Sequence, residues 1–304
     1  MLWKEQDERI ILSVPTEFSF QKNLQYLARS TNECLFYVHD NKIRKAIPID
    51  TYTFLIEISE RDDHTLLIEF LSNTRPTDKN VREQVVAYIL DWFDMQTKLQ
   101  AFYKMAKTDP ILQQAIEKFH GLRIMGIPDL FEAMAWGILG QQINLTYAYT
   151  LKRRLVEKFG RSIPFEDQLY WVFPTPSDIA KLTVEDLVDL KMTVKKCEYL
   201  IEVAQLIDKG LLTKDMLIET NDLKKAEKIL TNIRGIGPWT ANYVLMRCAR
   251  FPSAFPIDDV GLHNALKLVT NSEQKPSKDE ILKMSFPWKG WEAYATFYLW
   301  RFLY

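Results

Sequence analysis

The sequence predicts an α+β protein, with a small antiparallel sheet near the N-terminus and a mainly helical remainder. Apolar and polar residues alternate within short runs in the first third of the chain, which is typical of strands. From about Thr77 onward apolar residues recur every three or four positions, and explicit helix-start signals follow. We therefore expect an antiparallel sheet domain with helices at residues 1–95 and an all-helical domain at residues 96–304.

Short runs of residues define the expected N-terminal elements. Apolar runs at residues 9–14 and 34–39 predict two strands, and the spacing of leucines within residues 20–30 predicts a helix between them. Residues 52–59 alternate and residues 65–71 return with the same character, so they predict a hairpin around a polar tip at 61–64. An antiparallel sheet with one or two helices fits this order.

The rest of the chain is expected to consist of helices joined by short turns. Apolar residues from Val81 to Leu99 recur at helical spacing. Thr175-Pro-Ser-Asp178 combines a capping residue, a first-turn proline and an acid three positions on, and Thr183-Val-Glu-Asp186 repeats the threonine-to-acid spacing. Both segments therefore predict helix starts.

The composition excludes several classes of protein. The chain has 304 residues, of which 47% are apolar and 26% charged, so it can bury a core and is not an extended disordered chain. Three cysteines and four scattered histidines argue against a disulfide framework, a zinc site or an iron–sulfur cluster. Neither a signal peptide nor a membrane-spanning window is present, so we expect a reducing, cytoplasmic location.

Charge is nearly balanced along the whole chain but differs between its parts. The net charge is −1, which argues against binding to nucleic acid through bulk charge. The first 100 residues carry 12 basic and 16 acidic side chains, and the remainder carries 27 and 24. The helical part is therefore the one expected to meet a polyanion, although this excess of basic residues is weak evidence.

The most informative segment is Leu-Thr-Asn-Ile-Arg-Gly-Ile-Gly-Pro-Trp-Thr-Ala-Asn-Tyr at residues 230–243. An apolar stripe predicts a helix before it, Gly235 and Gly237 predict a tight turn, and Pro238 suits the first position of a second helix. The free amides at that helix start carry the positive end of its dipole and suit a phosphate. A turn that merely packs two helices is the alternative, because glycine caps are common.

Two features downstream of the turn favour a functional role. Trp239 and Tyr243 are four residues apart and so lie on one helix face. Asp258 and Asp259 follow in Phe-Pro-Ile-Asp-Asp-Val and open another helix. Aspartates at a helix start are often only caps, so the acid pair alone does not identify a site.

The combination of these motifs resembles the DNA-3-methyladenine glycosylase II family, or alkylbase DNA glycosidases, within the helix-hairpin-helix glycosylase superfamily. The resemblance rests on Ile-x-Gly-Ile-Gly-Pro-Trp-Thr-Ala followed by Pro-x-Asp-Asp, and on three further segments in the family's order. These are Phe131-Glu132-x5-Ile-Leu-Gly-Gln-Gln142, Phe173-Pro-Thr-Pro176, and Pro287-Trp-Lys-x-Trp-x2-Tyr-x5-Trp300. The N-terminal third is matched only by its β character and position. The resemblance implies two helical subdomains that flank an active-site cleft.

The family implies a catalytic role for Asp259 and an aromatic base pocket of Trp239, Tyr243 and Trp300. Cleavage of an N-glycosidic bond builds positive charge on the sugar, which a carboxylate stabilises. A cationic alkylated purine stacks favourably on electron-rich rings. Bifunctional relatives carry a lysine where this chain has Trp239, and an indole cannot form a Schiff base. The resemblance therefore implies a monofunctional hydrolase that flips out alkylated (3-methyl or 7-methyl) purines and leaves an abasic site.

The family also implies how DNA is held. Gln142 occupies the wedge position that fills the gap left by the flipped base, although it can equally be a polar residue that ends a helix. Gly235, Gly237 and Thr240 belong to the DNA-binding hairpin, and Arg234, Arg247 and Arg250 are candidates for phosphate contacts or for plain surface charge. The carbonyls of Thr231, Ile233 and Gly235 match those that hold a structural Na⁺ or K⁺. We expect no other cofactor, double-stranded DNA with alkylated bases as the partner, and a cytoplasmic, nucleoid-associated monomer.

Three other interpretations of the sequence stay open. A glycosylase for oxidised or mispaired bases would share the chemistry, but Trp239 and the lack of a four-cysteine cluster count against it. A non-catalytic helix-hairpin-helix module would need the glycine turn without Asp259 or the aromatic residues. A helical interaction protein unrelated to DNA would leave the turn motif unexplained.

Overall fold

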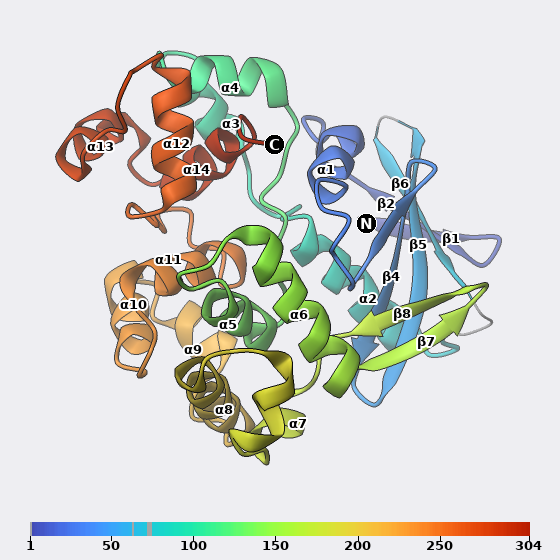
Figure 1. Ribbon diagram of the computed structural model, residues 1–304. Helices are drawn as coiled ribbons and strands as arrows, with labels where there is room; N and C mark the ends of the chain where they lie inside the picture. The colour runs from blue at the N-terminus through green and yellow to red at the C-terminus, as the bar shows by residue number, and fades with distance from the viewer. Residues whose placement is uncertain (1, 63, 72–74) are drawn as a thin grey trace.

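The predicted α+β class is confirmed by a computed structural model, which describes residues 2–62, 64–71 and 75–304. A twisted sheet lies on one side of the molecule and the helices fill the other (Figure 1). The predicted boundary between residues 95 and 96 falls between the second helix and the third, and it stays a prediction. Among the described residues, no helix is both long and apolar enough to cross a bilayer.

Six antiparallel strands make up the sheet, in the order β1-β2-β6-β5-β4-β3. Strands were correctly predicted at β2, β5 and β6, whereas β1 and β4 were missed and the predicted strand at 34–39 shrinks to β3. Strand β4 escaped notice because lysine, arginine and proline interrupt its apolar pattern. The bounds are β1 Trp3–Gln6, β2 Arg9–Ser13, β3 Tyr37–His39, β4 Lys42–Ile49, β5 Tyr52–Asp62 and β6 Thr65–Phe70.

The predicted β5–β6 hairpin is confirmed, but its tip is tighter than expected. Strand β5 continues into the predicted polar tip as far as Asp62, and Asp62 pairs with Thr65 after a register shift. Asp63, which belonged to the predicted tip, lies outside the described residues. Helix α1 (Phe20–Leu27) falls within the helix predicted at residues 20–30, and α2 (Lys79–Trp92) follows the sheet. Both contribute buried side chains to the main core with one face of the sheet.

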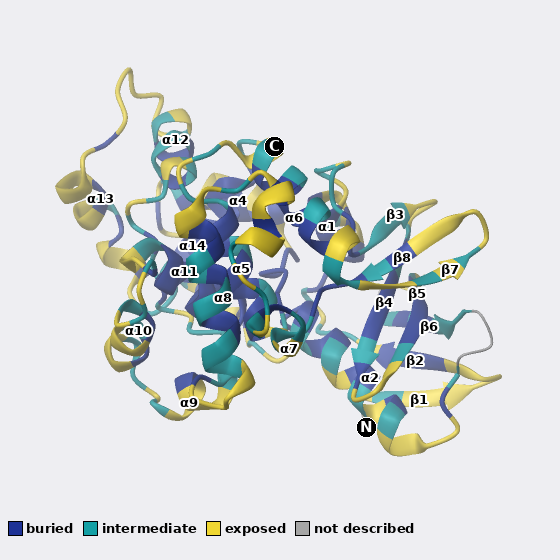
Figure 2. Cartoon of the chain, turned by 60° about the horizontal axis from the view of Figure 1, so that its bottom comes forward, coloured by how far each residue is buried: buried dark blue, intermediate teal, exposed yellow. Residues whose placement is uncertain are grey.

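The other face of the sheet is covered in part by a second hairpin, which contradicts the expectation that only helices follow Thr77. Strands β7 (Arg161–Phe165) and β8 (Gln168–Val172) pair antiparallel. Tyr170 and Val172 of β8 bury Ala46 and Leu55 of the sheet in a small separate core. The hairpin buries so few apolar residues that its sequence carries little periodic signal, and much of it is exposed (Figure 2).

The helices form two groups. In one group α12 packs on α14, α14 on α4, and α4 on α3; in the other α5 packs on α11, α8 and α6, and α10 packs on α11. The bounds are α3 Gln100–Ala106, α4 Leu112–Phe119, α5 Leu130–Leu139, α6 Leu145–Phe159, α7 Pro176–Ala180, α8 Val194–Asp208, α9 Lys214–Glu219, α10 Leu223–Thr231, α11 Pro238–Arg247, α12 Val260–Val269, α13 Lys278–Met284 and α14 Glu292–Trp300, with 3₁₀ turns η1 Glu185–Leu190 and η2 Phe286–Trp288.

The predicted capping signals had different outcomes. Thr175 and Asp178 form a reciprocal capping box at the start of α7, as predicted. Thr183 also donates to the carboxylate of Asp186, but this pair lies at the start of a 3₁₀ turn and not of an α-helix. Helices α5 and α14 are buried along almost their whole lengths (Figure 2). They form the rigid centre against which the elements of the site are placed.

Candidate active site

The glycine turn joins α10 to α11, and its two glycines differ in backbone conformation and in the space around them. Gly235 has φ +84, and a Cβ there would overlap the ring of Tyr199. Both facts require glycine at this position. Gly237 has φ −87 and is the N-cap of α11, and a Cβ there would meet no atom within 4 Å. Gly237 therefore does not need a positive φ, and it leaves an exposed, unobstructed backbone at the helix start.

The first turn of α11 presents main-chain groups and little else. Pro238 occupies the first helical position as predicted, and no side chain caps the helix. Thr240 is 2% exposed, and a Cβ on Gly137 of α5 would collide with its side chain. Thr240 therefore offers only its backbone to the surface of the hairpin.

Asp259 ends the loop after α11 and is the N-cap of α12. Its Oδ2 accepts hydrogen bonds from the Leu262 amide at 2.7 Å and from Trp300 Nε1 at 2.8 Å. Its Oδ1 accepts from Trp239 Nε1 at 2.9 Å. A helix start and two indoles from separate helices thus fix one carboxylate from three directions, which a plain helix cap does not require.

Gly261 makes this arrangement sterically allowed and was not noticed in the sequence. A Cβ at Gly261 would lie 2.8 Å from Asp259 Oδ2 and 3.2 Å from Trp300 Nε1. Any side chain there would push apart the indole and the carboxylate. The neighbouring Asp258 is exposed and pairs with Lys278 at 3.0 Å, which agrees with its expected structural role.

The three predicted aromatic residues come together beside Asp259. Trp239 and Tyr243 stack at 5.4 Å between ring centroids with an interplanar angle of 18°, and Trp300 lies 6.5 Å from Tyr243. Tyr243 and Trp300 are nearly buried, whereas Trp239 is partly exposed. Because Trp239 and Tyr243 already stack on each other, a base cannot lie between them and must meet an outer face of the cluster.

The loop between α5 and α6 carries two glutamines with different contacts. Gln142 is exposed and has φ +56, a left-handed conformation that costs a non-glycine residue free energy. Gln141 donates from Nε2 to the carbonyl of Gly235 at 2.8 Å. This bond ties the loop that presents Gln142 to the glycine turn, and Gln141 was not singled out from the sequence.

Of the three arginines considered for phosphate contacts, only Arg234 lies on the surface, where it pairs with Glu198. Arg247 donates to the Met125 carbonyl at 2.5 Å and to the Tyr243 hydroxyl at 3.0 Å, in a buried position. Arg250 pairs with Asp91 and donates to a main-chain carbonyl. The suggestion that Arg247 and Arg250 contact phosphate is therefore wrong. Exposed cations on the helix before the turn are Lys224, Lys225 and Lys228 of α10.

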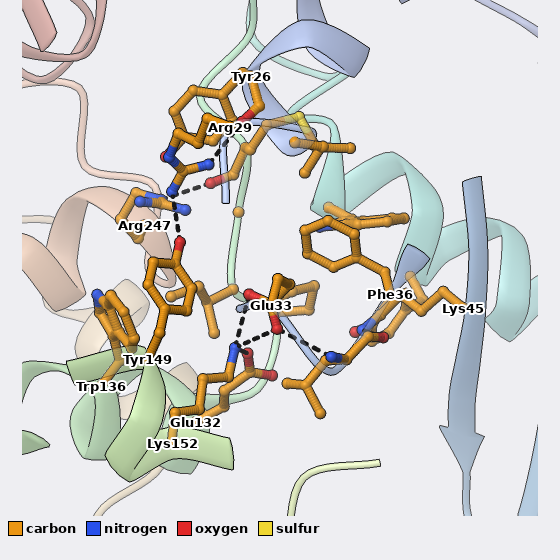
Figure 3. A pocket seen from close by; sticks show the side chains of 18 of the residues that line it. Tyr26, Arg29, Glu33, Phe36, Lys45, Glu132, Trp136, Tyr149, Lys152 and Arg247 are labelled. Atoms are coloured by element: carbon orange, nitrogen blue, oxygen red, sulfur yellow. Dashed lines mark hydrogen bonds and ion pairs between the residues drawn. The ribbon is translucent and has the colours of Figure 1, made fainter. Parts of the chain in front are cut away.

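A polar cavity of about 50 Å³ lies where the sheet domain meets α5, α6 and α11 (Figure 3). Tyr243 and Arg247 line it from α11, and Glu33 enters it from the loop between α1 and β3. Lys152 of α6 and Glu132 of α5 complete a charged cluster around Glu33 (Figure 3). Sequence reasoning did not identify this cluster, because its members lie far apart along the chain.

Comparisons with known families agree with this architecture. Residues 135–289 match the HhH-GPD superfamily of base excision DNA repair proteins. Residues 4–134 match the N-terminal domain of 8-oxoguanine DNA glycosylases. The chain is 52% identical over 304 residues, all of both chains, to a DNA-3-methyladenine glycosylase of Bacillus subtilis. It is 27% identical to DNA-3-methyladenine glycosylase 2 of Escherichia coli over 282 residues, and this alignment covers 91% of each chain.

Solved structures share the fold. A 3-methyladenine DNA glycosylase from Archaeoglobus fulgidus has a TM-score of 0.82 at 21% identity, over 96% of this chain and 97% of that one. An 8-oxoguanine glycosylase/lyase from Clostridium acetobutylicum, in complex with double-stranded DNA, has a TM-score of 0.75 at 16% identity. The match covers 99% of this chain and 97% of that one. At these identities the likeness concerns the fold.

Proposed function

The chain belongs to the HhH-GPD superfamily of base excision DNA repair proteins and is a DNA glycosylase for alkylated bases, and we propose that Asp259 is its catalytic group. In this proposal the enzyme flips a 3-methyl or 7-methyl purine out of duplex DNA and hydrolyses its N-glycosidic bond. The product is an abasic site in an uncut strand. The observation that carries the proposal is the Asp259 carboxylate held by Leu262, Trp239 and Trp300.

The chemistry follows from the charge that develops as the bond breaks. The C1′–N bond gives its electron pair to the departing base, and positive charge appears on the sugar. The hydrogen bonds from two indoles and one amide keep Asp259 in a fixed position, so that it faces the cationic sugar with little reorganisation. The carboxylate also serves to orient the water whose oxygen bonds to C1′ and whose proton is then lost to solvent.

The aromatic cluster supports selection of alkylated purines. N-alkylation makes a purine cationic, and a cation over an indole or phenol ring gains about 0.5–2 kcal/mol. The same charge weakens the glycosidic bond, so the base leaves as a neutral molecule without a strong general acid. Stacking has little preference for particular base edges, which supports a broad set of lesions.

Trp239 supports a monofunctional reaction. A lyase step would require an amine that attacks C1′ and forms a Schiff base, and the indole nitrogen has no lone pair available for this. In this chain the indole instead donates to Asp259. Water is then the nucleophile, and the strand stays intact.

The substrate is DNA, and the hairpin supports a grip on its backbone. The open helix start at Gly237 offers main-chain amides to a phosphate. Gln142, held in a left-handed conformation at an exposed tip, suits insertion into the gap beside the flipped nucleotide. An amide there would also hydrogen-bond the orphaned partner base.

The hairpin also suits a structural Na⁺ or K⁺. The carbonyls of Thr231, Ile233 and Gly235 are hard oxygen donors on one short turn, and Gly235 uses only one of its lone pairs for the bond to Gln141. When bound, the ion would link backbone oxygens to a phosphate. We further propose that the enzyme acts as a monomer, associated with the nucleoid in the cytoplasm.

One assay tests the catalytic proposal. Purified enzyme is incubated with methylated duplex DNA, and released 3-methyladenine and 7-methylguanine are measured alongside an Asp259→Asn variant. Release by the wild type alone, with strand breaks appearing only after alkali treatment, supports it. Equal release by both proteins would remove Asp259 from its role, and direct strand cleavage would contradict the monofunctional reaction.

A second substrate class has one observation in its favour. Residues 4–134 match the N-terminal domain of 8-oxoguanine glycosylases. Trp239 counts against this class, because it occupies the position at which bifunctional relatives carry the reactive lysine. A duplex with a single 8-oxoguanine, added to the same assay, distinguishes the two.

A further inference from the structure

We propose that Glu33 is a specificity-determining residue, which accepts hydrogen bonds from the amino and imino edge of the flipped purine in the cavity behind Tyr243. The inference rests on the proposed function and adds a preference that stacking alone does not supply. It predicts that a guanine-type edge, with two adjacent donors, is favoured over an edge with fewer donors.

Two stacked rings, Trp239 and Tyr243, lie between the catalytic carboxylate and the cavity. Asp259 accepts from Trp239, Trp239 stacks on Tyr243, and Tyr243 forms part of the cavity wall. Glu33 comes from the sheet domain and points into the cavity from the side away from α11 (Figure 3). In this proposal a purine whose sugar sits at Asp259 passes the outer edge of the stacked rings, and its far edge then points toward Glu33.

Glu33 is ionised and firmly held. Burial alone would raise the pKa of Glu33, but Lys152 and the amides of Leu35 and Cys34 lower it below its ordinary value. Lys152 Nζ lies 3.0 Å from Oε1 of Glu33 and 3.4 Å from Oε1 of Glu132. An ionised carboxylate only accepts hydrogen bonds, so it selects ligands by the donors they carry.

The two oxygens of Glu33 differ in the number of donors that reach them. Oε1 accepts from the Cys34 amide at 2.8 Å, the Leu35 amide at 2.9 Å and Lys152. Oε2 accepts from Lys152 alone among the described residues, at 3.1 Å. Each carboxylate oxygen has two lone pairs, so Oε2 keeps acceptor capacity on the cavity side.

The chemistry of the base edge decides which lesions benefit. Guanine carries the adjacent donors N1–H and N2–H₂, whereas adenine carries only its 6-amino group beside an acceptor nitrogen. A hydrogen bond to a charged partner discriminates by roughly tenfold or more, because an acceptor edge would leave Glu33 unsatisfied. 7-Methylguanine should therefore gain more from Glu33 than 3-methyladenine does.

The cavity must open before a purine can enter. Its volume of about 50 Å³ is well below the roughly 300–1,000 Å³ of typical ligand pockets. Arg29 bridges across it, donating to the Tyr26 carbonyl at 2.8 Å and to the Tyr149 hydroxyl at 3.2 Å (Figure 3). For a base to enter, the hydrogen bond between Arg29 and Tyr149 would have to break.

The alternative is that Glu33 and Lys152 form an ion pair that only joins the sheet domain to α6. Free bases separate the two roles, because 7-methylguanine and 7-methylhypoxanthine differ only in the 2-amino group. Their dissociation constants are measured by quenching of tryptophan fluorescence in the wild type, Glu33→Gln and the exposed control Glu157→Gln. We expect wild type and Glu157→Gln to bind 7-methylguanine about tenfold more tightly than 7-methylhypoxanthine, and Glu33→Gln to bind them alike.

Base release from methylated duplex DNA gives the second readout. Glu33→Gln should lower the ratio of released 7-methylguanine to 3-methyladenine by about tenfold, and Glu157→Gln should leave it unchanged. Equal binding of the two free bases by the wild type would overturn the proposal even if Glu33→Gln did not fold. An unchanged release ratio in folded Glu33→Gln would also overturn it. Loss of all release by the wild type would instead contradict the proposed function, while the free-base comparison would still test Glu33.

Discussion

The indole nitrogen of Trp239 lies 2.9 Å from Oδ1 of Asp259 and donates a hydrogen bond to it. The sequence predicted that these residues share a site, but it assigned Trp239 a stacking role alone. The contact shows that the same side chain both stacks on Tyr243 and positions the carboxylate. Trp300 makes the matching contact to the other carboxylate oxygen, at 2.8 Å.

Trp239→Phe should separate these two roles. Phenylalanine keeps a ring against Tyr243 but cannot donate to Asp259. Since a hydrogen bond to a charged group contributes about 1.5–3 kcal/mol, we expect the single-turnover rate of base release to fall by roughly tenfold or more. DNA affinity should change little. The remote variant Trp171→Phe serves as the control, and an unaltered rate in Trp239→Phe would show that the contact does not support catalysis.

Asp259→Asn and Asp259→Ala should differ in stability but not in activity. Both remove the negative charge, so base release should fall by at least about a hundredfold. Asparagine can still cap α12 at Leu262 and accept from Trp300, but its NH2 group then faces the Trp239 donor, so its unfolding free energy should fall less than that of the alanine variant. Alanine removes the cap and leaves two indole donors unpaired, and should cost about 1–3 kcal/mol. Denaturant unfolding and base release, measured on both variants, check this.

From the sequence alone, either substitution at residue 259 is expected to leave folding intact, whereas the three hydrogen bonds to the carboxylate predict a loss of stability for alanine. If Asp259→Ala proved as stable as Asp259→Asn, the three hydrogen bonds to the carboxylate would contribute nothing to the fold. If Asp259→Asn kept full activity, the negative charge would not be required.

Local patterns were sufficient to predict most of the helices and the glycine turn, whereas the roles of Asp259 and the aromatic residues came from the family resemblance. The glycine turn, Pro238 and Asp259 each have a short-range signature, and the family resemblance supplied Trp300, which lies 41 residues beyond Asp259. What escaped prediction depends on contacts between distant segments. Gly261 matters only because Trp300 packs across it, and Gln141 only because Gly235 is its partner.

The same reason explains the missed strands and the missed charged cluster. Strand β4 contains Lys45, which is buried over the rings of Tyr88 and Trp92, and no local rule anticipates a buried lysine in a strand. Glu33 and Lys152 are 119 residues apart and carry no shared motif. Their pairing follows from the docking of the sheet domain on α6, which only the folded structure reveals.

Gly235→Ala and Gly237→Ala form a matched pair across the turn. Alanine at 235 meets both a positive φ and the ring of Tyr199, so it should destabilise the protein by about 2–4 kcal/mol. Alanine at 237 has an ordinary φ and open space, so its unfolding free energy should change by less than about 1 kcal/mol. Thermal and denaturant unfolding measure both effects.

Gly237→Ala also tests whether the backbone at the start of α11 contacts DNA. If the backbone at Gly237 approaches a phosphate, the added methyl group should weaken binding of an abasic duplex severalfold in a protein that is otherwise stable. Unchanged affinity in Gly237→Ala would place the phosphate contact elsewhere.

Stability should fall in acid partly through Glu57. Burial alone would raise the pKa of Glu57, but hydrogen bonds from Lys42 and Arg44 at 2.6 and 2.7 Å lower it. A carboxylate whose folded pKa is lowered stabilises the protein above its unfolded pKa of about 4.5, and this is lost as the pH falls further. Glu57→Gln should therefore be less stable at pH 7 and lose less stability between pH 5 and 3. The exposed Glu60→Gln is the control for urea unfolding at each pH.

Gln142→Gly should change folding and function in opposite directions. Gln142 holds φ +56 at an exposed tip, so glycine relieves strain and should raise the unfolding free energy by up to about 1 kcal/mol. Glycine has no side chain to fill the gap beside a flipped nucleotide, so base release from duplex DNA should fall by tenfold or more, while release from single-stranded DNA should change little. Lys191→Gly, at φ +60 on the surface, should gain similar stability with no loss of release. Equal activity of Gln142→Gly and the wild type on duplex DNA would mean that another residue inserts into the helix.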